Sequence, residues 1–321
     1  MRYEEILRHI GNSEEKLRVR YLYALSGITK EQLGLFRAAW AAIATERRRL
    51  IIRQLAEITE QSFEVNFDPI FFMALEDEDS QVRAAAIEGL WENEDRALIA
   101  PLIRMMQSDE AEIVRAAAAA ALGRFVLLAE LEKLDSAIGA RIEEALRATI
   151  ANPAETIEVR RRAVESIAYS GKAGVRKIIR EAYDSEDEKM QSSALFAMGR
   201  SADPYWRHLL LNELDSHNPE LRYEAARACG ELELASAVPR LAELALHDPD
   251  REVQQVAVWA LGNIGGKEAR RILEMCYESD DEVLRDAAAD ALDEMDVWDG
   301  MMFSIPLYED LADEDDEEEE E

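Results

Sequence analysis

Apolar side chains recur at helical spacing along most of the chain, in pairs of short segments. Residues 235–246 are apolar at Val238 and Leu241 and again one turn later, which is the period of a helix. After a turn at residues 247–250, which contains Asp and Pro, residues 252–264 show the same period. This pattern predicts two helices joined by a tight turn.

A short motif opens the second helix of each predicted pair. It is an aliphatic residue followed in most copies by Arg or Gln, and its nine copies are 31 to 33 residues apart except for one step of 45. A small residue, usually alanine, stands four positions later and would let neighbouring helices approach closely. A period of this size predicts stacked helix pairs rather than one globular core. The copies are Leu17-Arg18, Leu50-Ile51, Val82-Arg83, Val114-Arg115, Val159-Arg160, Met190-Gln191, Leu221-Arg222, Val253-Gln254 and Leu284-Arg285.

The repeat covers nearly the whole chain and no strand pattern of any weight interrupts it. We therefore predict an all-α fold, a right-handed α-solenoid of about nine two-helix repeats over residues 1–295. The long step covers residues 125–153, where we expect a second helix lengthened through Leu134 and then a helix over residues 136–151. The alternative is an insertion that carries function, as insertions in solenoids often do.

Charge narrows the classes of partner. The formal net charge is -31, and residues 296–321 hold 13 acidic residues and no Lys or Arg, so residues 1–295 carry -18. An acidic body argues against general binding to nucleic acid or to an anionic membrane, both of which need basic surface. Three short basic clusters, at residues 47–53, 160–162 and 176–180, are expected to be charged helix surface.

The cellular setting is inferred from what the sequence lacks. No apolar run is long enough to cross a bilayer, and the first residues lack the apolar core of a signal peptide. Cys229 and Cys276 fall at apolar helix positions and are expected to be reduced core thiols. We therefore expect a cytoplasmic protein.

The motif resembles that of HEAT repeats, most closely the short bacterial type named after phycobilisome lyases. Residues 114–123 and 253–262 show the resemblance best, with the aliphatic opening, the small residue and a final Leu-Gly. The resemblance implies that the second helices line a concave groove. It also implies that the motif arginines and the turn aspartates join neighbouring repeats and are structural, namely Arg83, Arg115, Arg160, Arg222, Asp77, Asp109 and Asp248.

Catalytic chemistry finds no support in the sequence. Similar repeats in deoxyhypusine hydroxylases bind two irons through His-Glu pairs just after the motif Arg, and this chain contains no His-Glu pair. Its four histidines have no further His or Cys ligands at metal-binding spacing. We expect no metal, no cofactor and no catalytic residues, although a lyase-like accessory activity stays open.

One column of positions on the second helices should point away from the core. In the middle and later repeats it combines aromatic residues with arginines, which is the composition of binding hot spots. The alternative is partial burial of these side chains against the neighbouring repeat, and Trp91 could belong to either the core or the groove. The candidate partner-binding residues are Arg161, Arg162, Phe196, Arg200, Tyr223, Arg227 and Trp259.

The repeat pattern stops near Asp296. An apolar segment without helical period follows, and then an acidic run over residues 309–321 that we expect to be disordered. We treat residues 296–321 as a separate capping or docking region. The segment could cap the solenoid, dock a partner, or fold back on the groove as an autoinhibitor. Its candidate docking residues are Trp298, Met302, Phe303 and Leu307.

These observations favour a non-enzymatic scaffold that binds a partner protein or peptide along the concave groove. Two alternatives remain open: a lyase-like or chaperone-like accessory protein that acts on another protein, and a regulator that uses the acidic tail as a nucleic-acid mimic. The sequence does not determine the oligomeric state, for which a monomer is our expectation.

Overall fold

A computed structural model of the chain describes residues 2–62 and 64–302. Throughout these residues the regular secondary structure is helical and no strand occurs, which confirms the all-α prediction. The chain forms two compact units, Met1–Ser201 and Ala202–Glu321. We call them unit 1 and unit 2 and describe each by itself.

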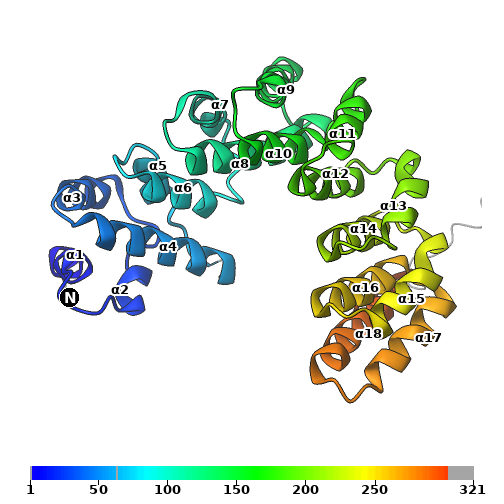
Figure 1. Cartoon of the computed structure of the whole chain (residues 1–321). Coiled ribbons are helices and arrows are strands. Elements are labelled where there is room, and N and C mark those ends of the chain that lie inside the picture. The colour runs from blue at the N-terminus through cyan, green and yellow to red at the C-terminus, as the bar shows by residue number, and fades with distance from the viewer. Residues whose placement is uncertain (1, 63, 303–321) are drawn as a thin grey trace, which may run out of the picture. The chain divides into compact units, whose positions relative to one another are not determined.

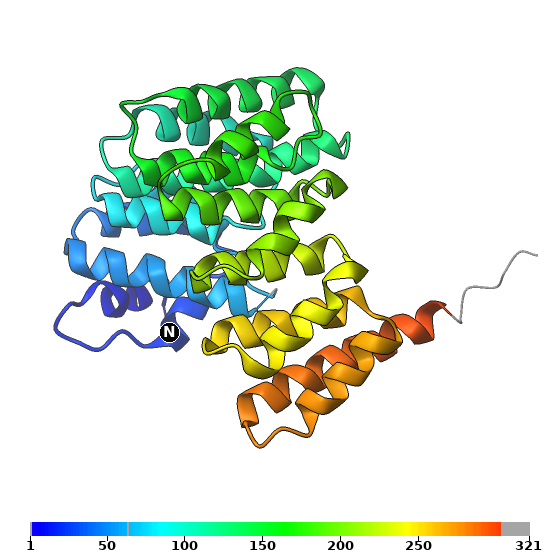
Figure 2. The same cartoon turned by 45° about the vertical axis from the view of Figure 1, so that its right-hand side comes forward.

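Unit 1 is a stack of helix pairs in which each second helix packs on the second helices before and after it (Figure 1). The row of second helices in this unit is α4, α6, α8, α10 and α12, which Figure 2 shows from another side. The helices are α1 (Tyr3–Gly11), α2 (Val19–Tyr23), α3 (Lys30–Trp40), α4 (Thr45–Gln61), α5 (Asp68–Ala74), α6 (Ser80–Gly89), η1 (Arg96–Leu98), α7 (Ile99–Ser108), α8 (Glu112–Glu130), α9 (Ser136–Ala151), α10 (Ile157–Ile167), α11 (Val175–Tyr183) and α12 (Glu188–Arg200).

Unit 2 repeats this arrangement with fewer helices. Its second helices α14, α16 and α18 pack in a row, with α15 and α17 against them. The elements are η2 (Pro204–Trp206), α13 (Arg207–Glu213), α14 (Pro219–Glu231), η3 (Ala235–Ala237), α15 (Val238–His247), α16 (Arg251–Ile264), α17 (Gly266–Tyr277) and α18 (Glu282–Met302).

Side-chain caps explain why the second helices begin where they do. The Asp79 carboxylate accepts the backbone N–H groups of Gln81 and Val82 at the start of α6, and Asp250 caps α16 in the same way. Such a cap satisfies amide groups that would otherwise lack a partner in the first turn. The aspartate that directly precedes each of these two helices is therefore a helix-start signal.

The alanines of the motif lie where helices meet. All seven are fully buried, as expected for side chains small enough to let adjacent helices come into contact. Trp40 and Trp206 are also buried and belong to the core, and both cysteines are buried free thiols. The alanines are Ala86, Ala118, Ala163, Ala194, Ala225, Ala257 and Ala288.

Arginine forks connect successive repeats. Arg83 Nε and Nη2 donate to Asp109 at 2.9 and 2.7 Å, and in unit 2 Arg222 binds Asp248 in the same way, with both distances 2.8 Å. This confirms the structural role expected for those two arginines. Arg115 departs from the expected pairing, since its fork binds Glu155 across the long step.

Arg160 and Asp77 also have structural contacts, but other ones than the motif implies. Arg160 Nε donates to the carbonyl of Ile150 in α9, the helix that precedes it. Asp77 accepts the indole N–H of Trp40 at 2.6 Å. Each residue thus holds neighbouring segments together, and neither takes part in an Arg–Asp fork.

Two sequence predictions about helix limits need adjustment. The long step does contain a helix at Ser136–Ala151, but the helix before it ends at Glu130 instead of continuing to Leu134. At the other end, α18 continues past Asp296 to Met302, where the sequence suggested that helical structure stops. Hydrophobic period alone misses a helix whose last turns carry no regular apolar stripe.

One basic cluster is structural, contrary to the expectation of charged surface. Arg47 and Arg48 on α4 are buried, and Arg47 Nε donates to the Ile10 carbonyl at 2.7 Å while Arg48 Nη2 donates to Glu78 at 2.7 Å. These guanidinium groups join α4 to the segments on either side. They are therefore unavailable to a partner.

Candidate functional site

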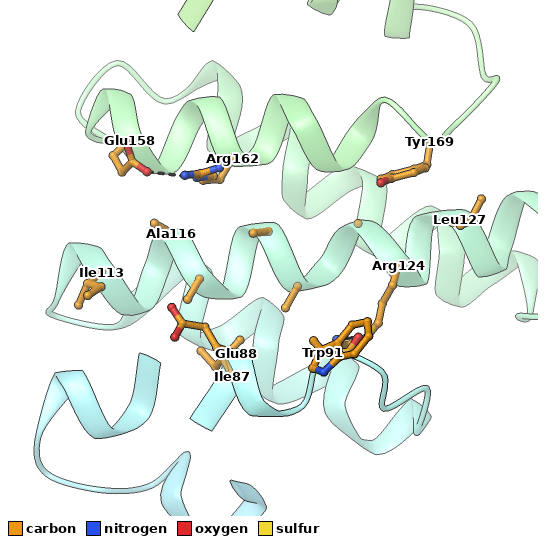
Figure 3. A pocket seen from close by; sticks show the side chains of 14 residues that line it. Ile87, Glu88, Trp91, Ile113, Ala116, Arg124, Leu127, Glu158, Arg162 and Tyr169 are labelled. Carbon is orange, nitrogen blue, oxygen red and sulfur yellow. Dashed lines mark hydrogen bonds and ion pairs between the residues drawn. The ribbon is translucent and has the colours of Figure 1, made fainter. Parts of the chain in front are cut away.

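Unit 1 contains a cavity of about 540 Å³ on the solvent-facing side of the second helices α6, α8 and α10 (Figure 3). Its floor is α8, which carries an unbroken alanine run at residues 116–121. Ala118 and Ala119 point into the core, whereas Ala120 is exposed in the floor. The cavity exists because no side chain on this stretch of α8 extends beyond Cβ.

The rim of the cavity is apolar and exposed. Trp91, in the turn after α6, is 44% exposed, and Ile113 and Leu127, near the two ends of α8, are 51% and 38% exposed. Large apolar side chains gathered around one depression are typical of a binding surface, whereas single exposed ones are common on any protein. Trp91, which the sequence left between core and groove, lies at the groove.

Arg124 lies under this rim with an incomplete set of partners. Its Nη1 donates to the Trp91 carbonyl at 2.8 Å, and its guanidinium lies 4.8 Å from the centroid of the Phe125 ring. Its Nε and Nη2 atoms are shielded from solvent and have no hydrogen-bond partner among the described residues. Burial lowers the pKa of Arg124 to about 10, although the charges of Glu94 and Asp68 act in the opposite direction.

The side of the cavity away from Arg124 is acidic and carries the predicted residue Arg162. Glu158 Oε2 accepts from Arg161 Nε at 2.6 Å and Glu158 Oε1 accepts from Arg162 Nε at 3.1 Å. Both arginines also bind Glu165, which is buried. Arg162 therefore lines the cavity with its charge already balanced, whereas Arg161 does not line it and donates to Ser193 of α12.

Glu88 is the other acid of the cavity. Burial raises the pKa of its carboxyl, and repulsion from Glu60 adds to that shift while Arg53 opposes it. By contrast, the pKa of Glu158 is below its ordinary value: burial raises it, but the hydrogen bonds from Arg161 and the charges of Arg161 and Arg162 outweigh the burial.

Phe196 and Arg200 lie together on α12, also in unit 1. The Arg200 guanidinium stands 5.3 Å from the centroid of the Phe196 ring, so the two form a cation–π pair. Phe196 is half-buried and Arg200 exposed. They do not line the cavity on α8.

Tyr223, Arg227 and Trp259 lie in unit 2, on α14 and α16. Tyr223 and Arg227 are half-buried, and Arg227 forms ion pairs with Glu224 at 2.9 Å and Glu231 at 3.2 Å. The seven residues that the sequence placed in one column thus belong to two separate units.

The predicted docking residues at the C-terminus are only partly described. Trp298 and Met302 lie in the last turns of α18. Phe303 and Leu307 lie outside the described residues, as does the acidic run at 309–321.

Arg124, Ile113, Leu127 and Tyr169 line the cavity, and the sequence column did not include them. A signal for Arg124 was present: it follows Leu122-Gly123 in the register in which Arg200 follows Met198-Gly199. Ile113 and Leu127 gave no such signal, because apolar residues at helix ends usually belong to the core.

The described residues contain neither a group of metal ligands nor a membrane-spanning helix. Within residues 2–62 and 64–302, no three His, Cys, Asp or Glu side chains are grouped so that they could hold a metal ion. Over the same residues, none of the helices has the length and apolar character needed to cross a bilayer.

Comparison with solved structures identifies several similar helical folds. The complex of CpcE and CpcF of phycocyanin lyase from Nostoc sp. PCC7120 is 16% identical over 89% of this chain and 96% of that chain, with a TM-score of 0.52. Human deoxyhypusine hydroxylase is 18% identical over 92% and 96% of the two chains, with a TM-score of 0.36. Yeast importin-beta (Kap95p) is 16% identical over 91% of this chain and 41% of that chain, with a TM-score of 0.41.

Identities this low show similarity of fold and nothing about activity. No curated protein sequence matches the chain significantly. The family model of HEAT repeats, in contrast, matches residues 69–152 and 208–293, which together make up more than half of the chain. The chain therefore belongs to the HEAT-repeat family.

Proposed function

We propose that the protein is a non-enzymatic scaffold that binds a partner protein or peptide along the solvent-facing groove of its second helices. The observation that carries this proposal is the cavity on α8, with its alanine floor and its exposed rim of Trp91, Ile113 and Leu127. Its volume of about 540 Å³ lies within the range of ligand-binding clefts.

Rigid helices on three sides support this proposal. The floor and walls are formed by α6, α8 and α10, which pack on one another, so the groove is present before a partner arrives. A preformed groove avoids the free-energy cost of ordering a flexible binding loop. Large aromatic and aliphatic side chains at its rim would be buried on binding, and Trp is prominent among hot-spot residues.

The charges at the site favour binding over catalysis. Arg161 and Arg162 are held by Glu158 and Glu165 in a closed set of ion pairs, so their charges are already balanced. Phe196 and Arg200 would extend the contact surface within unit 1. Tyr223, Arg227 and Trp259 would form a second contact surface within unit 2.

Peptide selection followed by groove-blocking variants tests the proposal. Peptides selected from a random library on the full chain would be measured by fluorescence polarisation against the wild type, Ala120→Trp and Leu127→Ala. Leu131→Ala is the matched control, because Leu131 is a 54% exposed leucine at the end of the same helix that does not line the cavity.

We expect Ala120→Trp to weaken binding at least about tenfold, because the indole would occupy the floor, and Leu127→Ala to weaken it several-fold. Leu131→Ala should bind like the wild type. Selected peptides that bind Ala120→Trp as tightly as the wild type would refute the groove as the binding site. If only a Phe196/Tyr223/Trp259→Ala variant lost binding, the partner surface would lie on the other proposed residues.

A further inference from the structure

We propose that the Arg124 guanidinium anchors a carboxylate of the bound peptide, beside a bulky apolar side chain held by the rim of the cavity. This inference rests on the proposed function, because it assumes that a peptide occupies the groove. It specifies that the peptide must carry a carboxylate and at which end of the groove this carboxylate lies.

The other arginine forks of this chain show what the Arg124 fork is suited to bind. Arg83, Arg115 and Arg222 each use Nε and Nη2 together to bind both oxygens of one carboxylate, at distances of 2.7 to 3.0 Å. Arg124 has the same two atoms unpaired while its Nη1 is held by the Trp91 carbonyl. The side chain is thus held at one nitrogen, while the edge that matches a carboxylate is shielded from solvent and makes no hydrogen bond.

The environment of Arg124 makes such a partner favourable. Unpaired donors that are shielded from water lose hydration without regaining a hydrogen bond, which costs free energy in the unbound state. The nearby acids do not supply that bond: Asp68 accepts from Asn93 at 2.6 Å, and Glu94 acts on Arg124 through charge alone. An incoming carboxylate would satisfy both donors and neutralise the buried charge.

Trp91 controls access to the fork. Figure 3 shows its indole next to the Arg124 side chain, at the end of the cavity opposite Glu88. The indole lies just beyond the end of α6 and is 44% exposed, so it can turn outward without disturbing the core. We infer that the carboxylate takes its place at Arg124 when the indole turns and packs against the peptide.

The acids in the cavity give the peptide a direction. Glu88 and Glu158 lie away from Arg124 and would repel a carboxylate placed beside them. Glu158 is neutralised by its two arginines, so Glu88 supplies most of that repulsion. Glu94 and Asp68 also act on the Arg124 end through charge, but only there does an unpaired fork offset the repulsion. The carboxylate should therefore lie at the end of the groove formed by Trp91 and Arg124.

The first test compares acid and amide forms of the same peptide. Groove-binding peptides would be resynthesised with each Asp or Glu replaced by Asn or Gln, and separately with a C-terminal carboxylate or amide, which distinguishes a side-chain acid from a chain terminus. On the wild type, neutralising the anchoring group should weaken binding at least about tenfold, the value of one charge-assisted bidentate contact. On Arg124→Lys, which keeps the charge and loses the fork, that difference should shrink to about threefold or less.

The second test needs no selected peptide and uses a variant only to assign a signal. The Nε–Hε resonances of arginine in the full chain would be followed by NMR during titration with 4-phenylbutyrate and with 4-phenylbutyramide, and Arg124→Lys identifies the Arg124 signal. The carboxylate should shift that signal and the amide should not.

The outcomes separate this inference from the proposed function. If Ala120→Trp blocks the peptides while their acid and amide forms bind equally and the Arg124 signal stays unmoved, the groove is real and the carboxylate anchor is refuted. If Ala120→Trp has no effect on the peptides, the proposed function fails and the inference fails with it.

Discussion

The helices α8 and α16 occupy the same place in their repeats, one in each unit, yet their outer faces differ. Both follow an Arg–Asp fork, and both carry Leu-Gly at the same offset from the motif, at Leu122-Gly123 and Leu261-Gly262. At the exposed position six residues after the motif, α8 has Ala120 in the floor of a cavity, whereas α16 has Trp259.

In unit 2 this tryptophan covers the neighbouring helix. A Cβ placed on Gly230 of α14 would come within 2.9 Å of the Trp259 ring and 2.8 Å of Ala260 Cα, so the two helices are in close contact there. One exposed position therefore decides whether the same scaffold presents a hollow or a filled face. The contacts that build the repeat are shared, and the surface depends on side-chain size at a few positions.

The largest expected effect on stability concerns the Arg–Asp forks, which both units contain. Arg222→Met and Arg83→Met each leave a poorly exposed aspartate without its fork, which should lower the free energy of unfolding by about 3 kcal/mol or more. Urea denaturation followed by circular dichroism gives the loss, and hydrogen exchange of the full chain locates it. Arg104→Met, on the exposed face of α7, is the control and should change stability by less than about 0.5 kcal/mol. Equal losses in the variant and the control would show that the forks are dispensable.

The next effect tests the close contact of α14 and α16. Gly230→Ala should destabilise the protein by about 1–3 kcal/mol, because the added methyl group meets backbone and an aromatic ring. Gly34→Ala on α3 meets nothing within 4 Å and should stabilise it by about 0.5–1 kcal/mol, since alanine favours a helix. Thermal unfolding measures both. A Gly230→Ala protein as stable as the wild type would mean that the two helices can separate without cost.

Exchanging Ala120 of α8 and Trp259 of α16 tests the difference between the two helices directly. Ala120→Trp should change stability by no more than about 0.5 kcal/mol while it closes the groove. Trp259→Ala should destabilise the protein by about 1–2 kcal/mol, since the 38% exposed ring loses its packing on α14, and should leave peptides of the α8 groove bound as before. Chemical denaturation and fluorescence polarisation together distinguish the two variants. The reverse pattern would assign binding to α16 and structure to α8.

The smallest effect is a pH dependence of unit 1. Burial raises the pKa of Asp109, but the hydrogen bonds from Arg83 and from the Ala111 amide outweigh it and hold the pKa below its ordinary value. Because the folded state then binds fewer protons than the unfolded state, this stabilisation is complete above about pH 4 and is lost as pH falls through the lowered value. Asp109→Asn should flatten that part of the curve of melting temperature against pH. An unchanged curve would show that other carboxylates govern the acid response.

Much of the fold could be read from the sequence because its determinants are local. The helical period, the turn aspartates and the motif alanines act within one repeat and its neighbour, so regular spacing along the chain becomes regular packing in space. The forks of Arg83 and Arg222 were expected from the resemblance to HEAT repeats. The resemblance was less informative at the long step, where α9 brought Glu155 to Arg115 across a distance that the motif does not encode.

The candidate site followed the sequence less closely. Counting positions placed Arg162 on the helix face that carries the cavity, but it could not tell that Glu165 would be buried. Nor could it tell that Arg124 would reach across to the Trp91 carbonyl. The ion pairs of Glu165 lie within α10, at i,i+3 and i,i+4 spacing. The burial of Glu165 and the contact of Arg124, in contrast, depend on how adjacent repeats pack.

The sequence alone was sufficient for the family, the repeat and the identity of the second helices, because these follow from periodicity and short-range capping. The location of a cavity, the partner of Arg124 and the division into two units emerged only in three dimensions. Those features depend on contacts between residues 25 to 50 positions apart, such as Ser166 Oγ with the Ala119 carbonyl. The regular sequence pattern determines the repeated scaffold, whereas the surface is set by the few side chains that depart from that pattern.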